Sequence, residues 1–201
     1  MWIGIYGLDI ETDTTPMHDS TPRGLDPTTT SIVNVAVSTR DGEIVFRGDE
    51  KSLLLSLDRY IRNLPVGVVA TWNGAVFDLP FIISRAKFLG IELGLTVSPA
   101  ENIWPKYEPL PGHRGGYHGV WSNHTAVPHA HLDIAYALQK HATDIGIQWS
   151  LKPLARHHGL SPIEVDRTAV HLLTPEQQDE YVASDARVTR VLAERLLTST
   201  L

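Results

Sequence analysis

Two carboxylates, Asp9 and Glu11, are spaced two residues apart at the end of an apolar run that begins at Trp2. In a β-strand, residues two apart project from the same face and lie about 6.7 Å apart along the strand axis. Both side chains can therefore reach one divalent cation, which predicts a metal-dependent hydrolase. A lone Asp-x-Glu is also compatible with a strand that ends in a solvated acidic turn.

A third carboxylate, Asp78, lies where a predicted strand gives way to a predicted helix. The strand pattern ends at Asn73-Gly74, which is a strong turn signal, and Pro80 fits the first turn of the helix. In open α/β sheets, ligands bind at the carboxyl ends of the strands. Asp78 is therefore a candidate site residue, although its position also suits a simple helix cap.

The C-terminal segment predicts a helix that begins after Thr174. Thr174 is a good N-cap, Pro175 fits the first helical position, and Gln177 completes a capping box. Tyr181 and Asp185 are spaced i, i+4 in this helix and share one face, so a phenol and a carboxylate can enter the same site. As an isolated pair they would also suit an exposed polar surface.

In order and spacing, these residues resemble the three motifs of the DEDD superfamily of 3′-5′ exonucleases. The sister subgroup of that superfamily has a histidine five residues before the last aspartate, where this chain has Glu180, so the resemblance is to the tyrosine subgroup. The matching motifs are Asp9-x-Glu11, Asn73-x-x-x-Phe77-Asp78 and Tyr181-x-x-x-Asp185.

Within that subgroup, the chain is most similar to the proofreading exonuclease domain of family B DNA polymerases. Leu25-Asp26-Pro27 and the Asp41-Gly42 hairpin signal resemble the opening hairpin of those domains. The segment 150–156 resembles a helix of protein-primed polymerases in which a lysine contacts the scissile phosphate, and that lysine is Lys152 here. A solvated lysine in the first turn of a helix is the alternative interpretation.

The resemblance implies a role for each carboxylate. Asp9, Glu11 and Asp185 would hold the metal that carries the nucleophilic water, while Asp9 would bridge to a second metal supported by Asp78. Carboxylates are hard oxygen donors, so the two ions would be Mg²⁺ or Mn²⁺. Such a pair of ions suits an in-line phosphoryl displacement.

The resemblance also implies roles for three uncharged residues. Tyr181 would orient the water, because a phenol with a pKa of about 10 is not an ordinary base near neutral pH. Asn73 would contact the terminal nucleotide and Phe77 would pack near it.

The function that these motifs predict is a stand-alone 3′-5′ exonuclease that releases nucleoside monophosphates from single-stranded DNA ends. Its partners would be DNA 3′ ends and a separate polymerase or repair protein. Two alternatives remain open at this point, since the motifs describe phosphate chemistry and say little about the 2′-OH. One is an exoribonuclease of the RNase D or oligoribonuclease type, and the other is a catalytically silent nucleic-acid-binding module associated with a polymerase.

Bulk properties favour a small soluble enzyme. The 201 residues are 42% hydrophobic and contain no long apolar run or signal-peptide pattern, which predicts a cytoplasmic protein without a membrane partner. The length suits one domain over residues 1–201 and is too short for a nuclease plus a polymerase. There is no cysteine, and the net charge of −6 argues against tight non-specific binding to nucleic acid.

The pattern of elements predicts an α/β fold with an RNase H-like, mixed five-stranded sheet flanked by helices. The strands are expected near 2–10, 32–39, 43–48, 66–72 and just before Asp133, and the helices near 50–63, 79–90, 134–143, 150–158 and 175–198.

Two irregular segments are expected between these elements. Residues 12–31 follow the first carboxylates and suit either a lip over the site or an ordinary surface loop. Residues 98–128 form a longer Gly-, Pro- and His-rich segment, of the kind that is functional or mobile. Its aromatic residues either stack on bases or, as we expect, anchor the segment to the core. They are Trp104, Tyr107, Tyr117 and Trp121.

A histidine-rich strand follows the second segment. His129, His131 and Asp133 alternate so that they would share one face, which is compatible with a metal site. Without cysteine and without a common zinc spacing, we instead expect Asp133 to structure a strand end near the site and the histidines to be solvated or to touch phosphate.

Overall fold

A computed structural model describes residues 3–13, 15, 26–106, 109–166 and 172–198. Seven strands form one sheet in the order β3-β2-β1-β4-β7-β6-β5. Strands β1, β4 and β7 run parallel, whereas β2 and β3 on one side and β6 and β5 on the other are antiparallel to their neighbours. The strands are β1 (Gly4–Thr12), β2 (Ile32–Thr39), β3 (Gly42–Arg47), β4 (Gly67–Thr71), β5 (Leu95–Ala100), β6 (Gly116–Trp121) and β7 (His129–Asp133).

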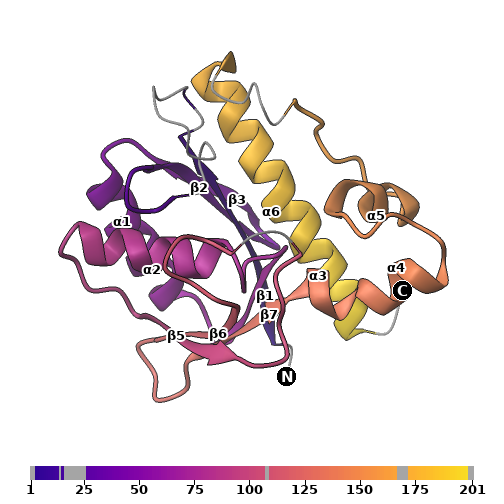
Figure 1. The fold of residues 1–201 in the computed structure, drawn as a ribbon, viewed down its shortest axis with the longest axis horizontal. Helices are drawn as coiled ribbons and strands as arrows, with labels where there is room; N and C mark the ends of the chain where they lie inside the picture. Colours follow the sequence, from indigo (N-terminus) through magenta and orange to yellow (C-terminus); the bar gives the residue numbers. More distant parts are fainter. Residues whose placement is uncertain (1–2, 14, 16–25, 107–108, 167–171, 199–201) are drawn as a thin grey trace.

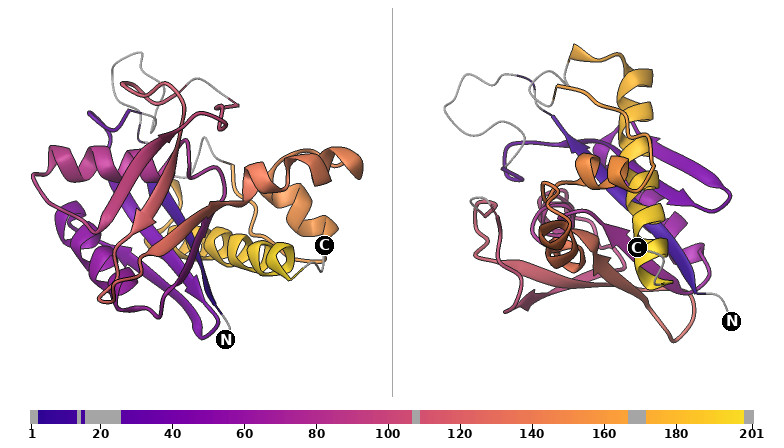
Figure 2. Two further views of the ribbon diagram at one scale, coloured as in Figure 1. Left: turned by 90° about the horizontal axis from the view of Figure 1, so that it is seen from below. Right: turned by 90° about the vertical axis from the view of Figure 1, so that its right-hand side faces the viewer.

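Helices cover both faces of the sheet (Figure 1; Figure 2, left). One face carries α1 and α2, and the other carries the long C-terminal helix α6 together with α3, α4 and α5. The helices are α1 (Glu50–Asn63), α2 (Asp78–Phe88), α3 (Ile134–Ala137), α4 (Gln139–Asp144), α5 (Leu151–His157) and α6 (Pro175–Leu197).

The alternation of β1 explains how one strand serves both faces. Leu8 and Ile10 are buried in the core formed with α1 and α2, while Ile5 packs in the core on the α6 side. Gly7 also faces α6, and a Cβ at this position would lie 1.9 Å from the carbonyl oxygen of Ala186. Helix α6 therefore rests directly on β1, and the odd-numbered positions Asp9 and Glu11 share the face that α6 covers.

Local signals in the sequence account for where several helices begin. The Asp49 carboxylate accepts a hydrogen bond from the backbone N–H of Ser52 and so caps α1. Thr174 and Gln177 form the expected capping box of α6, with Pro175 in its first turn. These interactions satisfy N–H groups that have no partner within their helix.

The mixed, RNase H-like sheet is confirmed, but the expected count of five strands is wrong. The two additional strands are β5 and β6, which form an antiparallel hairpin where an irregular segment was expected. Pro99 and Gly119 obscure the strand pattern there, and such residues are tolerated because the hairpin lies at one side of the sheet. Most of the other irregular segment, 12–31, lies outside the described residues, so the prediction of a lip is not tested.

Among the described residues, no helix combines the length and the apolar character needed to cross a membrane.

Candidate active site

The carboxyl ends of β1, β4 and β7 meet at one edge of the sheet, and β1 extends furthest. Its parallel pairing with β4 ends at Gly7 opposite Ala70, whereas its pairing with β2 continues to Thr12. Asp9 and Glu11 therefore lie beyond the last β4 pair. There the backbone N–H of Ile10 donates a hydrogen bond to the carboxylate of Asp78, which links the first motif directly to the second.

The turn after β4 positions Asp78. Asn73 has a φ of 68°, the left-handed conformation that asparagine tolerates better than most residues, and its carbonyl accepts the N–H groups of Val76 and Phe77. Helix α2 begins at Asp78 itself, the N-cap position is Phe77, and no side chain caps this helix. The interpretation of Asp78 as a simple helix cap is therefore wrong, and its 3% exposed carboxylate instead points towards β1.

Asp133 holds this turn from the neighbouring strand. Its carboxylate accepts backbone N–H groups from Asn73 at 2.9 Å, from Ala75 at 2.8 Å and from Ala135 at 3.0 Å. One side chain thus joins the end of β7 to both the Asn73 turn and the start of α3. The geometry confirms that Asp133 structures a strand end near the candidate site, and burial raises its pKa to about 6 in spite of these hydrogen bonds.

The carboxylates interact strongly enough to perturb one another. Burial raises the pKa of Asp9 well above its ordinary value, and the negative charges of Asp185, Asp78 and Glu11 raise it further. Burial also raises the pKa of Asp78 to about 8, with a contribution from the charge of Asp133. The structure thus brings the four predicted carboxylates, from β1, α2 and α6, into one electrostatically coupled group.

Lys152 from α5 enters the same group. Its Nζ donates to the Asp185 carboxylate at 2.6 Å and to the backbone carbonyl of Ile163, and it lies 4.3 Å from the centre of the Tyr181 ring. The Lys152 side chain is only 7% exposed, so the interpretation of a solvated lysine is wrong. Its charge opposes the rise in the pKa of Asp9, whereas the predicted contact with a scissile phosphate stays a prediction.

The donor set fits a hard divalent cation. Among the described residues, no three His, Asp or Glu side chains already converge as a metal centre. The like charges of the carboxylates act on Asp9, and Asp185 is paired with Lys152. A divalent cation among these buried oxygen donors would relieve the repulsion, which is the environment that Mg²⁺ and Mn²⁺ prefer.

The histidines of β7 do not face the carboxylates as solvated groups. His129 is fully buried, accepts the backbone N–H of Gly67 at 3.2 Å and lies 3.0 Å from the Asn123 amide. His131 contacts the Thr71 hydroxyl at 2.8 Å, and burial lowers its pKa to about 4. The expectation that the histidines are solvated or touch phosphate is therefore wrong for His129, whereas His131 is half-buried against the neighbouring strand β4.

The aromatic residues of segment 98–128 divide into two kinds. Trp121 is 1% exposed and donates its indole N–H to Asp58 at 2.8 Å, and the Tyr117 hydroxyl contacts His113 at 2.7 Å, so both anchor the segment as expected. Trp104 is 72% exposed and does not anchor the segment through its ring. Tyr107 lies outside the described residues.

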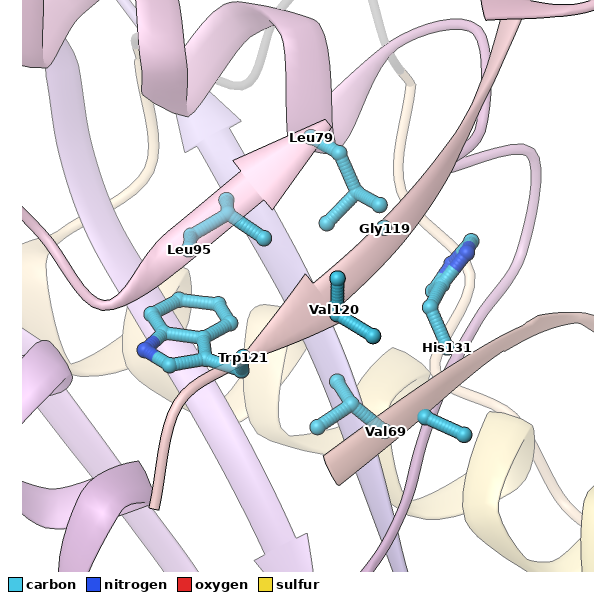
Figure 3. A pocket seen from close by; sticks show the side chains of 8 residues that line it. Val69, Leu79, Leu95, Gly119, Val120, Trp121 and His131 are labelled. Atoms are coloured by element: carbon cyan, nitrogen blue, oxygen red, sulfur yellow. The ribbon is translucent and has the colours of Figure 1, made fainter. Parts of the chain in front are cut away.

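One hollow in the described part of the chain lies away from the carboxylate group. It is a shallow apolar depression beside β6, and no carboxylate lines it (Figure 3). The residues that line it are Val69, Leu79, Leu95, Gly119, Val120, Trp121, Ala130 and His131. We therefore place the candidate active site at the carboxylate group, where charge and strand ends coincide, and not at this depression.

Sequence reasoning missed one link in the site. The hydrogen bond from the Ile10 backbone to Asp78 has no signature in the residue types, because any residue except proline at position 10 would supply the same N–H. The length of β1 relative to β4 leaves this N–H available, and strand length is a property of the assembled sheet.

Comparisons with known proteins identify the family of this chain. The family model described as "DNA polymerase family B, exonuclease domain" matches residues 9–124, more than half of the chain. The chain is 28% identical to the catalytic polypeptide of DNA polymerase epsilon from Eremothecium gossypii and 27% identical to the one from Kluyveromyces lactis, each over 148 residues. Those matches cover 72% of this chain but only 6% of each relative.

A solved structure shows the same fold. The family B DNA polymerase of the hyperthermophilic archaeon Pyrobaculum calidifontis superposes with a TM-score of 0.69 at 21% identity, covering 98% of this chain and 25% of that one. At 21% identity, this structural similarity shows the fold alone. Together with the family match that begins at Asp9, it shows that the chain belongs to the exonuclease domain family of the family B DNA polymerases, a family of 3′-5′ exonucleases.

Proposed function

We propose that residues 1–201 form one exonuclease unit that shortens single-stranded DNA from its 3′ end and releases nucleoside monophosphates. The observation that carries the proposal is the coupled group of four buried or half-buried carboxylates, placed on β1, α2 and α6 of a chain from this exonuclease family. DNA is the proposed substrate because the relatives are named as DNA polymerases. We propose that the unit acts together with a DNA polymerase, because the same relatives are DNA polymerases.

The proposal assigns the metal ligands to the four carboxylates. Asp9, Glu11 and Asp185 would hold one Mg²⁺ or Mn²⁺, and Asp9 together with Asp78 would hold a second. When bound, such ions lower the pKa of a water and stabilise charge on the departing oxygen. The coupling of Asp9 to the three other carboxylates supports this assignment, since all four must lie close together to bind a common pair of ions.

The remaining roles belong to residues of this chain that flank the carboxylates. The Tyr181 hydroxyl would orient the attacking water, and its ring already lies against the Lys152 ammonium. Lys152 would turn from Asp185 to the scissile phosphate, which is also an anion. The left-handed turn at Asn73 would present its amide to the terminal nucleotide, with Phe77 packed beside it. Strained turns of this kind often occur at binding sites.

The test compares DNA and RNA oligomers of the same sequence, labelled at the 5′ end. We expect stepwise shortening of the DNA with Mg²⁺ or Mn²⁺ and none with EDTA, because the carboxylates alone provide no cation for the phosphate. A circular single strand should survive, and an Asp9→Asn protein is the matched inactive control. Equal cutting of the circle would refute an exonuclease, preference for RNA would indicate an exoribonuclease, and binding without cleavage would indicate a silent module.

A further inference from the structure

The segment between β5 and β6 carries an exposed tryptophan whose backbone is tightly held. Trp104 is 72% exposed, while its carbonyl oxygen accepts a hydrogen bond from the Tyr136 hydroxyl at 2.9 Å. A single exposed apolar residue is common on protein surfaces and needs no explanation by itself. Trp104 differs from such a residue because an aromatic residue of α3, Tyr136, is hydrogen-bonded to its backbone.

Tyr136 in turn contacts a second aromatic side chain. Its ring packs edge-on against Trp149 with the ring centres 5.6 Å apart, and the Trp149 indole N–H donates to the Ala135 carbonyl at 2.6 Å. The Lys106 ammonium lies 5.4 Å from the centre of the Trp149 ring and donates to the Trp149 carbonyl at 3.4 Å. We call Trp104, Tyr136, Trp149 and Lys106 the aromatic shelf.

Hydrogen bonds connect the aromatic shelf to the Asn73 turn by two routes. Through one, the Ile103 carbonyl accepts the Gly116 N–H at 2.9 Å, and the next residue, Tyr117, donates its N–H to the Ala75 carbonyl at 2.8 Å. Through the other, Asp133 accepts the N–H of Ala75 in the turn and is also the N-cap of α3, the helix that carries Tyr136. The shelf therefore lies next to the turn that would contact a terminal nucleotide, and its residue Tyr136 belongs to α3, which Figure 1 labels.

We propose that the aromatic shelf binds the single-stranded DNA on the 5′ side of the terminal nucleotide, with a base stacked on Trp104. This inference rests on the proposed function, which places the 3′ end among the carboxylates. The chain has a net charge of −6, and the carboxylate group repels phosphates, so cationic contacts alone hold a strand poorly. Base stacking needs no charge and tolerates any sequence, which suits a strand that moves through the site.

The aromatic shelf also supplies a second local cation besides Lys152. Lys106 lies on the same segment as Trp104, two residues away, and its side chain is exposed to solvent. Its ammonium can meet the backbone of a strand whose base lies on the indole. The expected binding site is therefore a stacking face with one cationic neighbour, fitted to an unpaired strand and not to a duplex, whose bases are already stacked.

The test compares a 12-mer of single-stranded DNA with a dinucleotide, which carries only one nucleotide on the 5′ side of the scissile bond and lacks the rest of the strand. For Trp104→Ala, the ratio of kcat/KM for the 12-mer to kcat/KM for the dinucleotide should fall about tenfold, in keeping with the loss of one stacked base. Trp104→Phe, which keeps an aromatic face, should recover most of that ratio. Phe88→Ala is the matched control, because Phe88 is 64% exposed but lies at the far end of α2 from Asp78.

An abasic scan locates the stacked base. In wild-type protein, one abasic position in the 12-mer should weaken binding far more than its neighbours do, and Trp104→Ala should remove that sensitivity. The binding is measured by fluorescence anisotropy of a labelled 12-mer whose 3′ linkages are uncleavable phosphorothioates. Equal binding by wild type and Trp104→Ala, or an equal loss with Phe88→Ala, overturns the shelf and leaves the exonuclease proposal standing. Binding that depends on Trp104, without any cleavage of ordinary DNA, overturns the exonuclease proposal and leaves the shelf standing.

Discussion

Two buried ion pairs lie on opposite faces of the sheet and have almost the same exposure. Arg85 of α2 binds Glu50 of α1 on one face, and Lys152 of α5 binds Asp185 of α6 on the other. The side chains are 6% and 11% exposed in the first pair, and 7% and 7% in the second. Burial alone therefore does not distinguish a structural pair from a pair in an active site.

The Arg85–Glu50 pair is satisfied on every side. The guanidinium donates to both Glu50 oxygens, at 2.8 and 2.5 Å, and to the Pro27 carbonyl at 2.9 Å. The Glu50 carboxylate also accepts the backbone N–H of Ile32 at 2.8 Å. One bidentate pair thus joins α1, α2 and the start of β2, and an arginine fork suits such a fixed geometry.

The Lys152–Asp185 pair leaves charge unbalanced. One ammonium faces Asp185, but the negative charges of Asp185, Asp78 and Glu11 all act on Asp9. Lysine is a compact point charge on a flexible stem, which can exchange one anion for another. The surroundings of the two pairs, and not their depth, therefore differ: the Lys152–Asp185 pair lies among further carboxylates, where we propose that the chemistry takes place.

The largest effect should come from removing a carboxylate of the unbalanced group. Asp9→Ala should lower the rate of DNA shortening by about 10³-fold or more, because a metal ligand supports several kcal/mol of charge stabilisation. Its melting temperature in EDTA should equal or exceed that of the wild type, since one repelling charge is gone. Single-turnover assays with Mn²⁺ and a thermal melt measure the two quantities. An active Asp9→Ala protein would show that Asp9 of β1 is not a ligand of the metal site.

The complementary change breaks the complete pair. Glu50→Ala leaves a buried guanidinium and the Ile32 N–H without their carboxylate, so the free energy of unfolding should fall by about 3–5 kcal/mol. Exonuclease activity per folded molecule, measured well below the melting transition, should stay close to that of the wild type. Urea unfolding gives the stability, and Glu50→Gln, which keeps the shape and part of the hydrogen bonding, should lose less. A large loss of rate in folded protein would contradict the division between the pairs.

An intermediate effect is expected at Lys152. Lys152→Met keeps the length of the stem but removes the charge, which should lower the rate by about 10- to 100-fold if a charged hydrogen bond to phosphate is lost. The same change removes the cation that opposes repulsion around Asp9, so the melting temperature in EDTA should also fall. Lys152→Arg is the control that keeps the charge. An unchanged rate would leave Lys152 as a purely structural partner of Asp185.

The smallest effect is a shift of melting temperature with pH in EDTA. The pKa of Asp78 is raised to about 8, so the folded state holds this proton more tightly than the unfolded chain does. Stability should therefore fall as pH rises from about 4, the ordinary value, towards 8, and then level off. Asp78→Asn cannot ionise there and should melt higher than the wild type at pH 8, with a smaller fall between pH 5.5 and 8. Parallel curves for the two proteins would contradict the raised pKa.

The local elements of this protein follow from neighbouring residues. The capping box at Thr174, the cap at Asp49 and the alternation along β1 act within a few residues, so each can be recognised in the sequence. The order and spacing of the three motifs also predict the four carboxylates, because a shared family fixes which residues must meet. Local elements, and the choice of candidate site residues, are therefore the part that the sequence provides by itself.

The tertiary structure decides the partners of each charge. Lysines at positions 106 and 152 have the same chemistry, yet one is exposed and the other is buried against Asp185. The burial of His129 and the extension of the sheet by β5 and β6 likewise depend on strands that are distant in sequence. The solvation and the charge pairing of a side chain depend on all the residues around it, and only the assembled sheet brings those residues together. For that reason the residue types predict where the chemistry lies, and packing decides which ionised group is balanced and which is left to act.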